Sequence, residues 1–189
     1  MLHNLRKSLS KQNNMRKVKL YIAVSIDGLI ADKDGGIDWL NALPNPDNLD
    51  YGYFEMYNSI DATLMGNITY QQVLGFDIPF PYSDKQNFVF TRNQSLTKDE
   101  NVTYISDDIV NFVNDLKVKE GKSIWLIGGG KINTILLNAN LIDEMIITYI
   151  PTVLGEGIPL FTSDLQLKSF RLLKSEIHNT GVVSLTYVK

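Results

Sequence analysis

The chain has 189 residues, of which 44% are hydrophobic and 21% are charged, so it suits one domain with a buried core. Its formal net charge of −3 excludes a broad electropositive face for nucleic acid. The absence of cysteine excludes disulfides, thiolate metal sites and thiol nucleophiles. Because no apolar run approaches the roughly 20 residues that a membrane-spanning helix needs, we expect no membrane association.

Residues 1–14 are polar and basic, and they lack the apolar segment and cleavage site of a secretory signal peptide. We expect them to form a disordered tail, residues 15–189 to form the domain, and the protein to be cytoplasmic. Met15 directly precedes the first predicted strand, so the start of the protein is open between Met1 and Met15.

In the first half of the chain, strands are expected to alternate with helices and one long loop. Lys17 to Ile26 is β-rich and apolar on both faces, which is typical of a central strand, and Asp27-Gly28 ends it. Asp, Gly, Asn and Pro are dense from Ala31 to Asn48, which predicts a loop. Beyond it, apolar spacing predicts a helix over 50–59, a strand over 61–66 and a helix over 67–74.

The second half continues this alternation and ends in a hairpin. Strands are expected over 88–91, 102–105, 123–127 and 145–150, and helices over 107–119 and 131–138. Residues 170–178 and 182–188 alternate around Asn179-Thr180-Gly181, which is typical of an antiparallel hairpin. The order predicts a three-layer α/β/α domain with a mostly parallel mixed sheet and a C-terminal antiparallel hairpin. In such sheets, ligands bind at the carboxyl ends of the strands.

Three predicted strand ends carry residues suited to an anion. Gly128-Gly129-Gly130 lies between a strand and a helix, where bare backbone N–H groups can approach a phosphate. Met65-Gly66 has the same architecture, and Thr91-Arg92 adds a guanidinium suited to a phosphate. The alternative for the glycine run is a turn that simply requires positive φ, because its spacing matches no common nucleotide motif.

Several motifs resemble those of the reductase domain of the bacterial riboflavin-pathway deaminase-reductase, a domain that is similar to dihydrofolate reductase. The resemblance runs in order from about Met15 to the C-terminus and implies a dihydrofolate-reductase-like fold. The deaminase half is absent, since its zinc site requires cysteines. The matching segments are Ala23, Ser25 to Ala31, Met65-Gly66, Thr91-Arg92, Gly128-Gly129-Gly130 and Pro151 to Phe161.

The resemblance implies that NADPH binds across these strand ends, with its nicotinamide near Ala23 and Ile30. Many relatives have a basic residue where this chain has Asn67, so the 2′-phosphate would depend on Arg92, with Lys131 as a second cation. NADPH is therefore expected in preference to NADH. The implied cofactor residues are Ala23, Ile30, Gly66, Asn67, Ile68, Thr69, Thr91, Arg92, Gly128, Gly129, Gly130, Lys131 and Ile132.

The resemblance also suggests Asp50 as the acid that assists proton transfer to the substrate. Counted back from Met65-Gly66, Asp50 aligns with the acidic residue of dihydrofolate reductase, and Thr148 resembles the threonine that orients this acid. We expect Asp50 within hydrogen-bonding reach of Thr148, with a pKa raised by burial. The alternative is that Asp50 only caps a helix, which Asp does readily.

Trp39, Phe54, Leu154 and Gly155 are the expected substrate contacts by the same resemblance. Asp27 is expected to end a strand, and His178 to pack rather than react. No His or carboxylate cluster has ligand spacing, so we expect no metal.

These features predict an NADPH-dependent reductase that transfers a hydride to a small heterocycle of pterin or riboflavin-pathway pyrimidine type. The alternative is a non-catalytic NADP-binding or sensing protein whose substrate site has degenerated. The expected partners are a small-molecule substrate and a second copy of the chain, because the riboflavin-pathway relatives pair through their C-terminal region. Which heterocycle is the substrate is left open.

Overall fold

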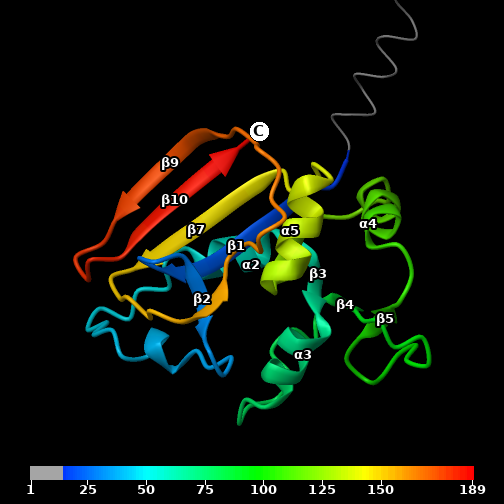
Figure 1. Cartoon of the computed structure of the whole chain (residues 1–189), viewed down its shortest axis with the longest axis horizontal. Coiled ribbons are helices and arrows are strands. Elements are labelled where there is room, and N and C mark those ends of the chain that lie inside the picture. Colours follow the sequence, from blue (N-terminus) through cyan, green and yellow to red (C-terminus); the bar gives the residue numbers. More distant parts are fainter. Residues whose placement is uncertain (1–14) are drawn as a thin grey trace, which may run out of the picture.

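A computed structural model describes residues 15–189, so the predicted tail at residues 1–14 lies outside the described residues. Its main feature is an eight-stranded sheet in the order β5-β4-β3-β6-β1-β7-β10-β9 (Figure 1). The strands are β1 (Val18–Ser25), β3 (Ile60–Gly66), β4 (Gln86–Phe90), β5 (Thr103–Ile105), β6 (Ser123–Gly128), β7 (Glu144–Ile150), β9 (Arg171–Ile177) and β10 (Val183–Val188).

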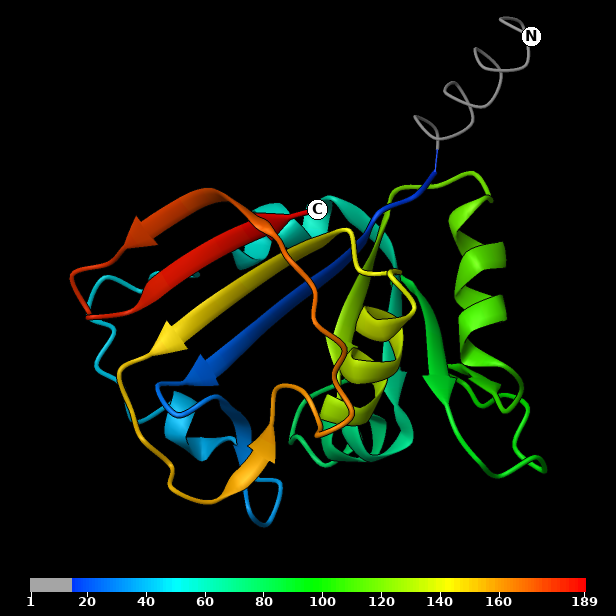
Figure 2. The same cartoon turned by 45° about the horizontal axis from the view of Figure 1, so that its top comes forward.

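The sheet is parallel from β5 to β7, and the antiparallel β9–β10 hairpin extends it. In Figure 2, the arrowheads of β1 (blue) and β7 (yellow) point the same way, while β10 (red) runs against them. The hairpin turn contains Gly181 at φ +84°, which glycine adopts without strain. The predicted mixed sheet with its C-terminal hairpin is confirmed.

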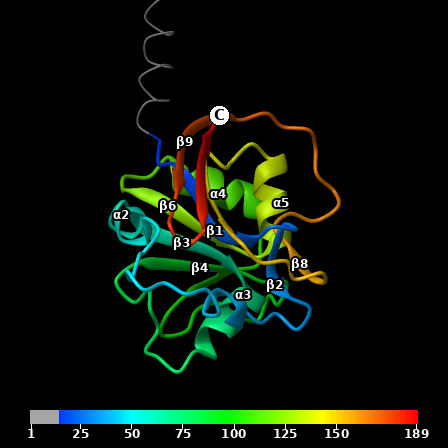
Figure 3. The same ribbon diagram turned by 90° about the vertical axis from the view of Figure 1, so that its left-hand side faces the viewer.

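Helices cover both faces of the sheet and make three layers (Figure 3). On one face, α4 (Ile109–Lys117) and α5 (Gly130–Asn138) bury Leu116 and Leu136 against the strands. On the other face, α2 (Tyr53–Asn58) and α3 (Asn67–Leu74) bury Met56 and Tyr70 around Trp125. Each such side chain contributes about 1.5–3 kcal/mol when fully buried. Within residues 15–189, no helix is both long and apolar enough to cross a bilayer.

A second, two-stranded sheet was not predicted. It pairs β2 (Leu29–Asp32), which overlaps the start of the loop expected from Ala31, with β8 (Gly157–Pro159) in antiparallel fashion. The short 3₁₀ helix η1 (Asp38–Leu40) follows in the same predicted loop. The pairing joins residues far apart in sequence, which a local pattern does not reveal. The helix predicted over 50–59 begins instead at Tyr53.

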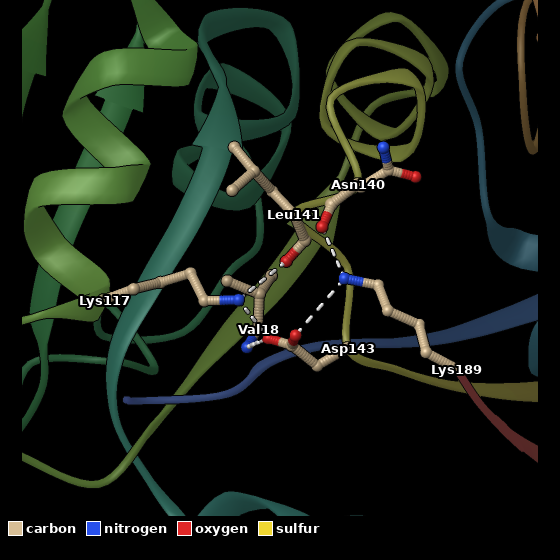
Figure 4. Close-up of polar contacts among 6 residues, drawn as sticks. All are labelled: Val18, Lys117, Asn140, Leu141, Asp143 and Lys189. Carbon is tan, nitrogen blue, oxygen red and sulfur yellow. Dashed lines mark hydrogen bonds and ion pairs between the residues drawn. The ribbon is translucent and has the colours of Figure 1, made fainter. Parts of the chain in front are cut away.

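At the amino ends of the strands, a buried ion pair fixes the sheet to α4 and to the last residue (Figure 4). Lys117 is 5% exposed, and its ammonium group lies 2.5 Å from Asp143 Oδ2. The same oxygen accepts a 2.8 Å hydrogen bond from the Val18 N–H. Lys189 Nζ lies 3.3 Å from Asp143 Oδ1 and donates to the Asn140 carbonyl. Because each buried charge is paired, loss of one partner would leave the other uncompensated.

The β2–β8 pairing predicts different outcomes at two neighbouring glycines. A Cβ at Gly157 would lie 2.1 Å from the Ala31 carbonyl oxygen, whereas at Gly155, with φ +79°, it would meet nothing within 4 Å. We expect Gly157→Ala to cost about 3 kcal/mol or more, and Gly155→Ala roughly 1 kcal/mol from backbone strain alone. Urea unfolding of both variants measures this, and equal costs would contradict the assigned contact.

Candidate cofactor and substrate site

The carboxyl ends of neighbouring parallel strands meet at one edge of the sheet. Gly66 at the end of β3 pairs with Phe90 at the end of β4, and Met65 pairs with Gly128 at the end of β6. Helix α3 begins directly after β3, and α5 begins within two residues of β6. The first N–H groups of both helices have no partner within the helix, so two positive helix ends face this edge.

The two strand-to-helix turns touch each other. The Thr69 hydroxyl donates to the Gly128 carbonyl at 3.4 Å, and Ile132 Cγ1 lies 3.4 Å from where a Gly66 Cβ would be. Gly129 has φ +92°, and a Cβ there would lie 3.2 Å from the Thr69 Oγ1. The predicted residues of both turns are thus brought together, with glycine backbone where a side chain would crowd the turn.

Polar groups beside these turns suit an anionic, nucleotide-like ligand. Asn67, the first residue of α3, has a buried side-chain oxygen with no hydrogen-bond partner in the structure. A buried unpaired acceptor is costly, and a ligand hydroxyl or amine would satisfy it. Arg92, just after β4, and Lys131, in the first turn of α5, are both exposed. Within residues 15–189, no three His, Asp or Glu side chains form a group that could hold a metal ion.

A cavity of about 200 Å³ lies on the same sheet, between β1, β7 and the segment that precedes α2. Tyr21 and Ala23 are two residues apart on β1, so their side chains share one face of the sheet. Thr148 on β7 pairs with Ala23. Two predicted site residues, Ala23 and Thr148, therefore line the same cavity. Its lining is Tyr21, Ala23, Leu40, Leu43, Asn45, Tyr51, Thr148 and Ile150.

Tyr21 and Thr148 contribute neutral hydroxyl groups to this cavity. The Tyr21 hydroxyl donates to the Tyr51 carbonyl at 3.3 Å, and the Thr148 and Ser184 hydroxyls are 3.1 Å apart. Burial raises the pKa of Tyr21 well above its ordinary value, and the negative charge of Asp50 raises it further. Tyr21 therefore keeps its proton and can act as a hydrogen-bond donor.

The β9–β10 turn holds the segment that closes the cavity. The Tyr51 ring packs edge-on against His178 with ring centroids 4.9 Å apart, and its hydroxyl donates to Thr180 Oγ1 at 3.2 Å. Asn179 Nδ2 donates to Asp47 Oδ2 at 2.8 Å. The prediction that His178 packs is confirmed.

The predicted contact between Asp50 and Thr148 is absent, and the predicted raised pKa is wrong. Asp50 is exposed and accepts backbone hydrogen bonds from Phe54 at 2.9 Å and Gly52 at 3.0 Å. The bond from Phe54, and to a smaller extent the bond from Gly52, lowers the pKa of the Asp50 carboxyl. Tyr51, with φ +51°, lines the cavity instead. Asp50 lies two residues before the N-cap residue Gly52 and caps the start of α2 from there through its bond with the Phe54 N–H.

The expected substrate contacts do not line the cavity. Trp39 lies in η1 beside the lining residue Leu40, and its indole N–H is buried without a partner. Phe54 is 70% exposed. The N–H groups of Leu154 and Gly155 donate to the Asp27 carboxylate at 3.1 and 2.7 Å.

Asp27 thereby links the end of β1 to the segment before β8. The Ser25 hydroxyl, followed by the N–H groups of Gly155 and Leu154, lowers the pKa of Asp27 to about 2. Its structural role is confirmed.

Ile30 and Ile68, two further predicted cofactor residues, differ in their surroundings. Ile30 lies in β2 and packs against the core, whereas Ile68, in the first turn of α3, is 80% exposed. Residues that sequence reasoning missed are Tyr21, Leu40, Leu43, Asn45, Tyr51 and Ile150. Tyr21 lies two residues before Ala23 on a predicted strand and therefore on the same face, which could have identified it as a lining residue.

The capping role of Asp50 predicts a change in stability. We expect Asp50→Ala to lower the free energy of unfolding by about 1 kcal/mol at pH 7, and Asp50→Asn, which keeps an acceptor, to lower it less. Because the folded pKa lies below the ordinary 3.8, this contribution is present above pH 3.8 and is lost as the pH falls through the lowered value. Chemical denaturation at pH 7 and pH 3 tests this, and an unchanged Asp50→Ala stability at pH 7 would contradict the cap.

The comparisons with known proteins agree with this fold. The uncharacterized protein YwjB of Bacillus subtilis (strain 168) is 41% identical over 177 residues, covering 92% of this chain and 98% of YwjB. A Shewanella sp. PV-4 protein assigned to riboflavin biosynthesis superposes with a TM-score of 0.81 at 36% identity, covering 91% of this chain and 98% of that one. Enterococcus faecalis dihydrofolate reductase in complex with NADP(H) has a TM-score of 0.65 at 17% identity, with 91% and 95% covered. The family described as RibD C-terminal domain matches residues 16–184, and the chain belongs to this family.

Proposed function

We propose that the chain is an NADPH-dependent reductase that reduces a C=N or equivalent bond of a small heterocycle of pterin or riboflavin-pathway pyrimidine type. The observation that carries this is the contact between the two glycine turns after β3 and β6, in the same sheet whose strands β1 and β7 line a cavity at Ala23 and Thr148. Such a reduction adds a hydride to carbon and a proton to nitrogen, and it converts NADPH to NADP⁺. The same fold in a dihydrofolate reductase complexed with NADP(H) supports the cofactor.

The residues at the strand ends suit the charged groups of NADPH, and the unpaired Asn67 oxygen could accept a hydrogen bond from one of its hydroxyl or amino groups. The N-termini of α3 and α5 would face the diphosphate, as helix ends do in other nucleotide sites. Arg92 would bind the 2′-phosphate, with Lys131 as a second cation. Ala23 and Ile30 would lie near the nicotinamide, which supplies the hydride when the cofactor is bound.

A non-catalytic NADP-binding protein is the second candidate, because neither a carboxylate nor a histidine lines the cavity. The open cavity itself favours the enzyme, since a degenerate site would be filled by side chains. Following NADPH absorbance while screening pterins, flavin-pathway pyrimidines and simple imines separates the two. Substrate-dependent oxidation supports the reductase, and tight NADPH binding without any oxidation supports the sensor.

Arg92 is expected to set the preference for NADPH over NADH. A guanidinium on a phosphate is a charge-assisted contact, so Arg92→Ala should cost about 1–3 kcal/mol in NADPH binding and leave NADH binding almost unchanged. Lys119→Ala, which removes an exposed cation just beyond the C-terminus of α4, is the control. Calorimetry measures the affinity of each of the three proteins for both cofactors, and equal affinity of the unmodified protein for NADPH and NADH would reject the assignment.

We also propose that the chain forms a homodimer through its C-terminal edge. All seven residues of β9 are exposed, among them Leu172 (49%), Leu173 (56%) and Ile177 (83%). An open apolar edge strand favours pairing with another chain. Light scattering at micromolar concentration should report a dimer, and Leu173→Asp should shift it toward monomer. A monomeric unmodified protein would contradict the proposal.

A further inference from the structure

The cavity is small and carries no charged side chain. Its eight lining residues comprise four aliphatic residues, two tyrosines, one threonine and one asparagine. Its volume of about 200 Å³ is below the roughly 300–1,000 Å³ of pockets for drug-sized ligands, so it suits a single ring. An anion placed there would lose its water without gaining a cation, which is unfavourable.

Most polar groups of the lining already have partners. Asn45 Nδ2 donates to the Leu49 carbonyl at 2.8 Å, and its Oδ1 accepts from the Leu49 N–H at 2.9 Å. The Thr148 hydroxyl is paired with Ser184 at 3.1 Å, and the Tyr51 hydroxyl donates to Thr180 at 3.2 Å.

Tyr21 also has a partner, but its hydrogen bond is the longest of those in the lining. Its hydroxyl donates to the Tyr51 carbonyl at 3.3 Å. A long bond between neutral groups is weak and easily exchanged for a bond to a ligand. Tyr21 is therefore the lining group that is best placed to donate to a bound molecule.

A negative charge acts on this hydroxyl. Asp50 contributes to the raised pKa of Tyr21 through its charge, so the carboxylate acts on the cavity although it does not line it. The candidate cations, Arg92 and Lys131, follow β4 and β6, whereas the cavity lies between β1 and β7. A phosphate or carboxylate inside the cavity would thus find no cation among the lining residues to compensate its charge.

We propose that this cavity takes an uncharged, single-ring heterocycle without phosphate or carboxylate, and that a ring oxygen or nitrogen accepts a hydrogen bond from Tyr21. The inference rests on the proposed function and names the substrate class of the same site.

Two single-ring probes of similar size, one neutral and one anionic, test this substrate class. Calorimetry first measures NADP⁺ binding, and ligand-observed NMR then compares neutral 6-aminouracil with anionic orotate on the nucleotide-saturated protein. We expect 6-aminouracil to bind at least about tenfold more tightly than orotate. Equal or tighter orotate binding, or no binding of either ring at millimolar concentration, would overturn the inference.

The role of Tyr21 is tested with two matched variants. Tyr21→Phe should weaken 6-aminouracil binding by about 2- to 10-fold, the value of one neutral hydrogen bond, and leave NADP⁺ affinity unchanged. Tyr57→Phe is the control, because Tyr57 belongs to the same aromatic cluster but its hydroxyl bonds to Asp84 and does not line the cavity. It should change neither affinity. Unchanged 6-aminouracil binding by Tyr21→Phe would overturn the assigned contact.

The two proposals fail in different ways. Absent NADP⁺ binding would contradict the proposed reductase, and the two rings would then be compared on the protein without nucleotide. Normal NADP⁺ binding with a preference for orotate would contradict only the substrate class.

Discussion

The site depends on a close approach of backbone at the turn between β6 and α5. A Cβ at Gly130 would lie 2.3 Å from the carbonyl oxygen of Pro159, so only glycine allows β8 to pass directly over the start of α5. A Cβ at Gly129 would lie 3.2 Å from the side-chain oxygen of Thr69 in the neighbouring turn, which is a less severe approach. These contacts join the turns after β3 and β6 and the β2–β8 sheet into one packed unit. The absence of side chains is what leaves N–H groups open to a phosphate.

The two edges of the parallel sheet serve different purposes. At the amino ends of the strands, the Asp143 carboxylate accepts hydrogen bonds from Lys117, the Val18 N–H and Lys189. These bonds fix the sheet to α4. At the carboxyl ends, the first N–H groups of α3 and α5 have no partner within their helices, and the Asn67 oxygen has none among residues 15–189. A rigid base thus supports an edge whose polar groups remain free for a ligand, as is general for open α/β sheets.

Local patterns predicted the strands and helices well, because each has its own periodicity and end signals. The parallel strands, α3 and the hairpin around Gly181 follow from such patterns. The β2–β8 pairing did not, since it depends on Gly157 meeting Ala31 across the molecule. The glycine turns were predicted correctly as neighbours because parallel strands end at one edge.

The substrate side was harder to predict than the cofactor side. Asp50 and Tyr51 are adjacent, and Tyr51 has a positive φ. In this conformation the Tyr51 side chain lines the cavity, whereas the Asp50 side chain bonds to the start of α2. Residue types alone do not reveal this choice of dihedral angle, because a positive φ is rare outside glycine. Counting residues back from Met65-Gly66 therefore suggested a role for Asp50 in the cavity that its position in the structure does not support.

The central claim is that three strand ends form one NADPH site. Hydrogen–deuterium exchange of backbone amides with and without NADPH tests it most directly, because binding would protect the N–H groups that hold the cofactor. The account predicts slower exchange together at residues 66–69, 91–92 and 128–132, with the β9–β10 hairpin unchanged. Protection confined to other segments, or none at saturating NADPH, would contradict it.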